Sequence, residues 1–451
     1  MALNFRIWRN RLACVAILWT MLGAGAPGTV LAQQNPVFYL VGAEEERPPT
    51  SGGLPQYKGV RVYELESATL RVVRSVDMDL GAGGTLSDTK WYALSGDMGM
   101  LTGDRKTIVL VDGGNDDEST LLLVSVPDLK IEGHMDIPMS QMPMDRDGER
   151  VPCLDHIFVH PVTGRTYFSC ELGRGGERIL AVDPVGRKVI GADLPTAGMY
   201  TRTFVYDSKR QWLYVSGTAP LITDAHDHLI GHIDDIEFCG VREIADRTNG
   251  EVCGVQKITG GSKRYGVRDM ALLPDGNLVL LSYVSETPVV SVYDPAAQKI
   301  RHAWIEDRTY TGLIGPGRIH GVRYEQPTPT ERVYNIYNVP VPSRDGSRLF
   351  GIEESESHAD GSKPSQDGGI LWDAGTLQVL HRWTLPEATS YSCSENGTGN
   401  GLVACFAPAP DGRGMWYFGK SGKVYRLDDQ SGQLIEEVKL PLHLISLIRE
   451  P

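Results

Sequence analysis

The densest group of residues able to do chemistry lies between residues 223 and 235. The segment reads Thr-Asp-Ala-His-Asp-His-Leu-Ile-Gly-His-Ile-Asp-Asp and so combines four acids with three histidines. Imidazole and carboxylate groups bind Zn²⁺ and similar ions, and His226 and His228 point the same way if the segment is extended. The sequence therefore predicts a divalent-metal site at Asp224, His226, His228 and His232. A polar insertion between two strands explains the same composition and stays open as the alternative.

A second group of reactive residues pairs tyrosine with arginine at a short spacing that recurs. One residue separates Tyr200 from Arg202, and two residues separate Tyr265 from Arg268. Arginine binds a carboxylate through paired hydrogen bonds, while histidine and tyrosine can act as general acids or bases. These four residues and His156 are therefore the predicted catalytic or anion-binding residues. A structural repeat explains the Tyr-Arg pairs equally, and a buried core histidine explains His156.

The elements that must position these residues come from two recurring sequence phrases. The first is an alternating apolar run, an acidic turn and a short β run, with its clearest copies at 179–195, 289–305, 369–386 and 424–441. The second is an apolar run, a turn rich in Pro, Asp and Gly, and another β run; it spans 156–170, 203–217, 270–284, 339–353 and 405–419. We expect the acid after the strand to cap its own turn, at Asp183, Asp294, Asp373 and Asp428. Together the two phrases supply four strands, as one β-propeller blade does.

Counting these units predicts an all-β fold, a seven-bladed β-propeller. The predicted blades lie near 37–80, 90–140, 153–196, 200–262, 265–308, 332–387 and 400–441. The first unit supplies only three strands, so the C-terminal run 443–450 is predicted to pair into it and close the ring without an open edge. No long segment has a sustained helical period, and a β-sandwich would not need the repeat. In a propeller, the predicted site residues begin the innermost strands around the central funnel.

The first 32 residues are predicted to be a cleaved export signal. Arg6, Arg9 and Arg11 precede an apolar run at 12–22 that is too short to span a bilayer, and small or apolar residues follow at 30–32. Residues 33–451 then form the propeller domain, which is periplasmic or secreted. We expect no further membrane span. An uncleaved membrane anchor remains the alternative.

Charge and cysteine content agree with an exported chain that does not bind nucleic acid. The formal charge is −13 and becomes −16 once the three arginines of the signal are removed, whereas nucleic-acid binding needs Lys and Arg to neutralise phosphates. Six cysteines remain, and an oxidising compartment favours disulfides between them. Among the possible pairings, we expect disulfides between sequence neighbours, because closing a short loop costs the least conformational entropy. These pairs are Cys153 with Cys170, Cys239 with Cys253, and Cys393 with Cys405.

One blade resembles a known family. The segment Cys153-Leu-Asp-His-Ile-Phe158, followed by a turn and Tyr167-Phe-Ser-Cys170, is similar to a hairpin in the heavy chain of bacterial methylamine and aromatic amine dehydrogenases. The likeness is confined to this blade, and its spacing differs by about two residues. It implies a periplasmic seven-bladed scaffold with no cofactor of its own. The tryptophan-derived quinone would lie on a separate small, cysteine-rich partner chain.

Two functions of different classes follow. The first is a binding scaffold, the large non-redox subunit of a periplasmic amine-dehydrogenase-like oxidoreductase, whose partner is a small quinone-bearing subunit. The alternative is a stand-alone lyase or hydrolase that acts through the funnel's His, Tyr and Arg on a small-molecule or polysaccharide substrate that is anionic, such as a uronate. Co-purification of a quinone-bearing chain favours the first, and turnover by the isolated chain favours the second.

Overall fold

The chain divides into two compact units, residues 1–35 and 36–451, and every residue described below belongs to the second. The predicted signal segment 1–32 lies outside the described residues. The computed structural model describes residues 37–47, 56–78, 92–93, 98–115, 118–144, 148–150, 155–171, 177–191, 203–217, 220–233, 237–241, 251–253, 267–284, 287–305, 308–314, 318–323, 334–336, 339–355, 368–387, 406–409, 411–419 and 421–449. None of the helices in these ranges has the length and apolar character needed to cross a membrane.

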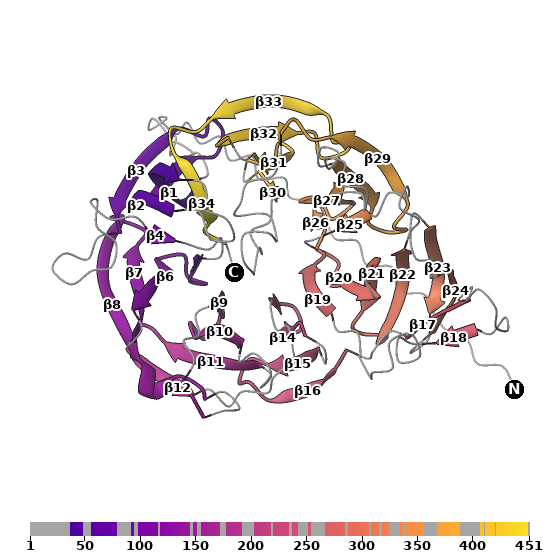
Figure 1. The fold of residues 1–451 in the computed structure, drawn as a ribbon, viewed down its shortest axis with the longest axis horizontal. Coiled ribbons are helices and arrows are strands. Elements are labelled where there is room, and N and C mark those ends of the chain that lie inside the picture. Colours follow the sequence, from indigo (N-terminus) through magenta and orange to yellow (C-terminus); the bar gives the residue numbers. More distant parts are fainter. Residues whose placement is uncertain are drawn as a thin grey trace, which may run out of the picture. The chain divides into compact units, whose positions relative to one another are not determined.

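Seven antiparallel sheets follow one another around a ring, which confirms the seven-bladed propeller (Figure 1). From the centre outward, blade 1 is β34 (His443–Leu447), β1 (Val37–Arg47), β2 (Gln56–Glu66) and β3 (Val72–Asp77), with β4 (Tyr92–Ala93) also paired to β2. Blade 2 is β5 (Gly99–Leu101), β6 (Thr107–Asn115), β7 (Glu118–Ser125) and β8 (Lys130–Pro138), followed by the short 3₁₀ helix η1 (Met139–Gln141). Blade 3 is β9 (Asp155–Val159), β10 (Thr166–Glu171), β11 (Glu177–Asp183) and β12 (Lys188–Gly191).

The remaining blades keep the same order of strands. Blade 4 is β13 (Phe204–Asp207), β14 (Trp212–Val215), β15 (Leu221–Asp224) and β16 (Leu229–His232). Blade 5 is β19 (Val267–Leu272), β20 (Leu278–Val284), β21 (Thr287–Asp294), β22 (Lys299–Ile305) and β23 (Arg308–Ile314). Blade 6 is β25 (Tyr334–Ile336) and β26 (Val341–Pro342), both paired to β27 (Arg348–Ser355), then β28 (Gly368–Asp373) and β29 (Val379–Thr384). Blade 7 is β30 (Phe406–Pro408), β31 (Met415–Phe418), β32 (Lys423–Leu427) and β33 (Leu434–Lys439).

The predicted boundary of the fourth blade, 200–262, is wrong at its C-terminal side. β16 already supplies the fourth strand, so the blade is complete by His232. The following β17 (Glu237–Val241) and β18 (Glu251–Cys253) form a separate sheet with β24 (Arg318–Arg323), to which β17 runs parallel. Cys239 lies opposite Cys253 in this sheet, a register compatible with their predicted pairing. In blade 3, Cys170 is buried and disulfide-bonded, whereas Cys153 lies outside the described residues.

The hydrophobic core lies in the seams between neighbouring blades. Trp304 of blade 5 and Trp372 of blade 6 meet edge to face, with ring centroids 5.5 Å apart. Phe38 of blade 1 and Trp416 of blade 7 are 4.5 Å apart in the seam that closes the ring. All four rings are buried. Aromatic rings bury large apolar areas and favour such offset arrangements. These strands consist of apolar runs because both of their faces are covered by neighbouring blades.

The C-terminal strand closes the ring as predicted, and its contacts reach across three blades. β34 pairs antiparallel with β1, with Val41 opposite Ser446. The chain then reaches blade 2, where the Leu101 N–H donates to the Arg449 carbonyl at 2.9 Å. The Arg449 guanidinium in turn donates to the Ile157 carbonyl of blade 3. We call residues 443–449 the clasp.

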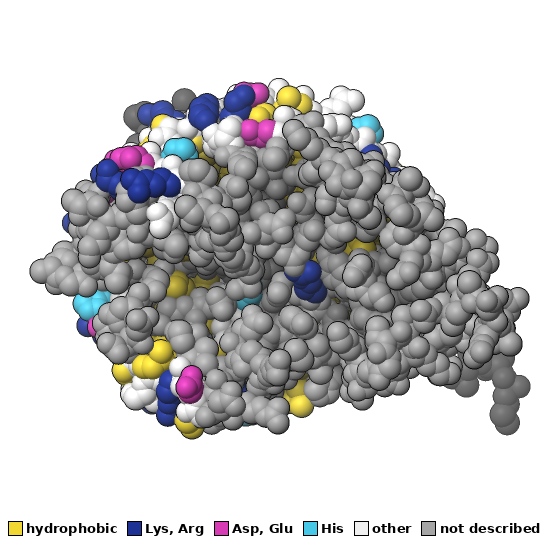
Figure 2. Space-filling view, viewed as in Figure 1, with side chains coloured by type: hydrophobic (Ala, Val, Ile, Leu, Met, Phe, Trp, Pro, Cys, Tyr) yellow, Lys and Arg dark blue, Asp and Glu magenta, His cyan; other side chains and the backbone are white. Residues whose placement is uncertain are grey.

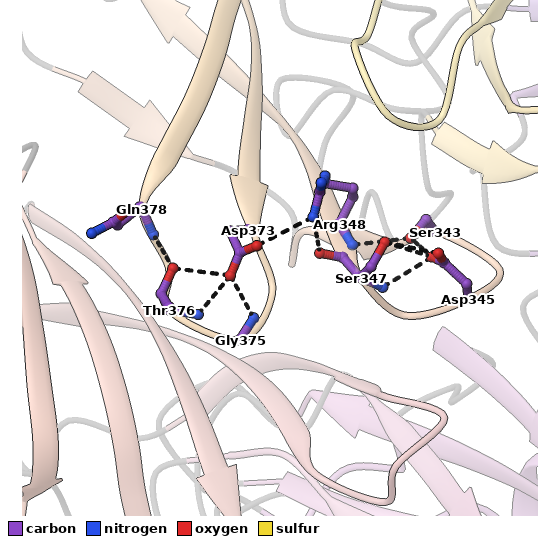
Figure 3. Close-up of polar contacts among 8 residues, drawn as sticks. All are labelled: Ser343, Asp345, Ser347, Arg348, Asp373, Gly375, Thr376 and Gln378. Carbon is purple, nitrogen blue, oxygen red and sulfur yellow. Dashed lines mark hydrogen bonds and ion pairs between the residues drawn. The ribbon is translucent and has the colours of Figure 1, made fainter.

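The acidic corner turns also form as predicted (Figure 3). In blade 6, Asp373 Oδ1 accepts hydrogen bonds from the N–H groups of Gly375 and Thr376 at 3.1 and 3.0 Å. Arg348 donates to the other carboxylate oxygen at 3.2 Å. The same cap recurs at Asp183, Asp294 and Asp428. Each cap satisfies backbone donors that the hairpin turn would otherwise leave to solvent.

Gly103 is expected to be irreplaceable in the seam between blades 2 and 3. A Cβ at this position would lie 1.9 Å from the Pro161 carbonyl oxygen, which belongs to the backbone of the next blade. Gly103→Ala must therefore push the two blades apart, and we expect it to lower the free energy of unfolding by about 1–3 kcal/mol or more. Urea unfolding measures this. Gly191→Ala, whose Cβ would meet nothing within 4 Å, is the control, and an equal effect of both changes would contradict the prediction.

Candidate functional site

The innermost strand of each blade from 2 to 7 is also its first strand in the chain, so all these strands begin at the same end of the ring. We call this the entry end. His156 is the second residue of β9, and Arg268 is the second residue of β19. Both therefore lie at the entry end, as predicted. Figure 2 shows a group of Lys or Arg atoms near the middle of the face turned to the viewer. Tyr200, Arg202 and Tyr265 lie outside the described residues, so their placement stays a prediction.

His156 occupies a β-bulge. Phe158 pairs with Tyr167 and Asp155 with Ser169, so His156 and Ile157 together oppose a single residue of β10. The backbone φ of His156 is +52°, and the residue is only 4 % exposed, which also fits the alternative of a buried core histidine. A left-handed conformation is unfavourable for a residue with a Cβ and must be maintained by its surroundings. Bulges change the direction of a side chain and are common beside active sites, so the backbone gives this imidazole a placement that a regular strand would not.

Asp269, the neighbour of Arg268, joins three blades at the entry end. Its carboxylate accepts hydrogen bonds from the Thr203 hydroxyl of blade 4 and from the Val339 N–H of blade 6, the latter at 2.9 Å. The Met270 N–H donates to the same carboxylate at 2.8 Å. Burial raises the pKa of Asp269, while the three donors and the Arg268 charge act in the opposite direction. The arrangement holds the innermost strands of blades 4, 5 and 6 in one fixed relation.

The predicted metal ligands lie in the β15–β16 turn of blade 4. Asp224 Oδ1 accepts the N–H groups of His226 and His228 at 2.7 and 2.9 Å, and Asp224 Oδ2 lies 3.0 Å from His228 Nδ1. These bonds, that of the His228 N–H first, hold the pKa of Asp224 below its ordinary value. The two exposed imidazole rings have centroids 6.2 Å apart. Asp224 is thus the corner-turn acid of blade 4, equivalent to Asp373 of blade 6.

The metal hypothesis itself is not tested by this geometry. The backbone of His232 lies in β16 opposite Leu221, and its side chain is outside the described residues. Among the side chains that the structure describes, no three acidic, histidine or cysteine groups gather around one point as metal ligands would. The site of Asp224, His226, His228 and His232 therefore remains a prediction. The structure adds that Asp224 has a role in the turn without any metal.

One member of the same acidic segment has a role that the sequence did not indicate. Asp227 reaches across the seam to blade 3, where it accepts a hydrogen bond from the Tyr167 hydroxyl at 2.7 Å and pairs with Arg165. Arg165 and Tyr167 lie some sixty residues away along the chain, so no local pattern links them. Only the blade repeat in the sequence could have indicated this contact. Aligning the blade 4 segment with the other blades places Asp227 in a corner turn, and that turn lies beside blade 3.

Comparison with known proteins adds no family. No family model matches the chain, and no curated protein sequence matches it. Among solved structures, a protein from Lactobacillus plantarum is 12% identical with a TM-score of 0.48, covering 92% of this chain and 99% of that one. A candidate 6-phosphogluconolactonase from Bacteroides uniformis is 11% identical (TM-score 0.46; 91% and 97% covered). A quinohemoprotein alcohol dehydrogenase from Pseudomonas putida is 11% identical (TM-score 0.45; 91% and 69% covered). These likenesses carry no inference about activity, and the propeller assignment rests on the strand pairing itself.

Proposed function

We propose that this chain is an exported binding scaffold whose entry end holds an anionic ligand or partner. One observation carries the proposal: the hydrogen bonds of Asp269 lock the innermost strands of three blades together directly beside Arg268. A guanidinium on a fixed strand can recognise a carboxylate without the entropic cost of ordering a loop. Seams closed by the Asp227 contact and by the clasp make the rest of the ring a rigid support.

The more specific proposal is the large non-redox subunit of a periplasmic amine-dehydrogenase-like complex. It is supported by the segment that resembles those heavy chains, because this segment forms the β9–β10 hairpin of blade 3. Tyr167, Phe168 and Cys170 of that hairpin are buried. The predicted export signal and the predicted disulfides are consistent with that location. In this proposal the quinone belongs to a small partner chain, and this chain binds the partner and shapes its substrate entrance.

Purification of the tagged full chain from the periplasm of its source cells tests the specific proposal. We expect a small cysteine-rich chain to co-purify in stoichiometric amount and to give a positive redox-cycling stain for protein-bound quinone. The control is a strain that expresses the tagged chain without its signal segment. That chain stays in the cytoplasm, and no quinone-bearing chain should co-purify with it. Recovery of the exported chain alone, or with partners that lack a quinone, would contradict the amine-dehydrogenase assignment.

A second function is favoured by one observation, the bulge that fixes the His156 imidazole. If the chain is itself a lyase or hydrolase on a uronate-containing polymer, His156 is its general base. Removing a positioned base typically slows the reaction by about 10²–10⁴-fold, and we expect that loss of kcat for His156→Gln. His134→Gln, on the exposed outer strand β8, is the control. Release of unsaturated uronate product measures the rate. Unchanged turnover in His156→Gln would remove His156 from the site.

A further inference from the structure

The seam between blades 3 and 4 contains a histidine that no function discussed so far uses. His160 follows β9 at the turn into β10, and its side chain is fully buried. Its ring packs against Tyr206 of β13 in the next blade, with centroids 4.6 Å apart. Phe158 and Tyr167 lie around the same ring at 6.4 and 6.5 Å. An ionisable group thus lies against three aromatic rings at a junction between two blades.

The hydrogen bonds of His160 require the neutral imidazole. Its Nδ1 accepts the backbone N–H groups of Val162 and Thr163 at 3.2 and 3.3 Å, so Nδ1 carries no proton. The single ring proton therefore resides on Nε2, which is buried without a hydrogen-bond partner among the described residues. A second proton would have to enter at Nδ1. It would remove both acceptor interactions and place a positive charge among aromatic rings.

The neighbouring blade shows that the turn itself does not need a histidine. In blade 4, Asp207 Oδ1 occupies the equivalent place and accepts the N–H groups of Lys209 and Arg210 at 2.9 and 3.2 Å. A carboxylate can therefore make this cap as well, and the side-chain oxygen of asparagine is an acceptor of the same kind. What distinguishes His160 is that a second proton would make its acceptor atom, Nδ1, a donor and so remove the cap.

We propose that the seam between blades 3 and 4 is an acid-sensitive latch, closed while His160 is neutral and loosened when His160 takes up a second proton. The other half of the latch is the Asp227 turn, which reaches Arg165 and Tyr167 on the same hairpin. Loss of the His160 cap would disturb the turn that presents Arg165. Because the predicted metal-binding turn contains Asp227, the position of that turn would then depend on acidity.

The charges around His160 act on its pKa in both directions. Burial lowers the pKa of His160 most strongly; the Asp227 carboxylate opposes this, and the Arg165 and His226 charges act with burial. The unfolded chain takes up the proton near pH 6.5 while the folded chain does not. The histidine therefore does not weaken the fold above about pH 6.5. Below that pH the opened or unfolded state binds a proton that the folded state does not, so the equilibrium constant for opening rises by up to about tenfold per pH unit.

Hydrogen exchange of the full chain at pH 7 and pH 5, corrected for intrinsic rates, tests the latch. We expect amides in 155–171 and 221–232 to lose protection at pH 5, by up to about tenfold per pH unit below 6.5. In His160→Asn the amide oxygen keeps the cap without titrating, so the loss should disappear. His134→Asn, on outer strand β8, should behave as the wild type. An equal loss in wild type and His160→Asn overturns the proposal.

If His160→Asn does not fold, a second variant and an NMR titration of the wild type test the latch. His160→Asp offers the acceptor that Asp207 supplies at the equivalent turn of blade 4, where it accepts the N–H groups two and three residues further on. In the wild type, the ring Cε1–H of His160 should titrate below pH 6.5 by NMR and should shift together with the Tyr206 ring signals. Titration at or above pH 6.5, or independence of the Tyr206 signals, overturns the latch.

Discussion

Deleting the clasp, residues 443–449 with the two that follow, is expected to prevent the ring from closing. The deletion removes the strand paired with β1 and exposes the apolar surface covered by Leu444, Ile445 and Ile448, each at most 6 % exposed. Burial of three such side chains stabilises the fold by roughly 5–9 kcal/mol, which is comparable with the whole stability of a typical domain. We therefore expect an aggregated or expanded chain, measured by size-exclusion chromatography and circular dichroism.

A point variant separates loss of the clasp from mere shortening of the chain. Ile445→Asp places a carboxylate at a position that is 1 % exposed and should have nearly the effect of the deletion. Leu434→Asp, on outer strand β33 where the side chain is 54 % exposed, should leave the chain folded. A shortened chain that stays monomeric with the wild-type spectrum and melting temperature would show that β34 does not hold the ring closed.

Replacing Asp269 by alanine is expected to cost about 3–5 kcal/mol of unfolding free energy. The change leaves the Thr203 hydroxyl and the N–H groups of Met270 and Val339 without their acceptor in a buried site, and each orphaned donor costs about 1–3 kcal/mol. Asp269→Asn should lose less, about 1–2 kcal/mol, because its amide nitrogen can oppose only one of the three donors. Chemical denaturation measures both values.

The control for Asp269 is an acid in an exposed turn of the same blade. Asp275 accepts the Asn277 N–H at 2.9 Å and is exposed, so Asp275→Ala should cost well under half as much as Asp269→Ala. If the two alanine variants are equally stable, the hydrogen bonds of Asp269 do not stabilise the contact between the three blades. The proposal that they hold Arg268 in a fixed position would then be contradicted.

The repeating parts of the fold could be predicted from the sequence because each blade reuses the same local chemistry. Alternating apolar runs and capped turns are short-range features, so the blades, the closing strand and the acids at Asp373 and Asp428 were all accessible. The fourth blade was misjudged because its corner turn, 224–228, is rich in histidine and suggested a metal site instead of a repeat. Its predicted end was therefore placed too late, in the sheet of β17 and β18.

The candidate site was only partly accessible, because its supporting contacts join residues far apart in the chain. Asp269 contacts residues 66 and 70 positions away, and Asp227 contacts residues 60 and 62 positions away. No pattern of neighbouring residues encodes such pairs. The bulge at His156 is likewise a property of its pairing with β10. Sequence reasoning could place His156 and Arg268 at the entry end, but it could not show what holds them there.

The central claim, that the entry end is the binding end, is tested most directly by hydrogen exchange of the purified complex against the isolated chain. Binding should protect amides at the starts of β9 and β19, residues 155–157 and 267–269, because ligand contacts and ordering there slow local opening. The corner turns at Asp373 and Asp428 lie at the end of the ring opposite the entry end. Their amide hydrogens should exchange at the same rate in both samples. Protection confined to those corner turns, with no change at the starts of β9 and β19, would contradict the account.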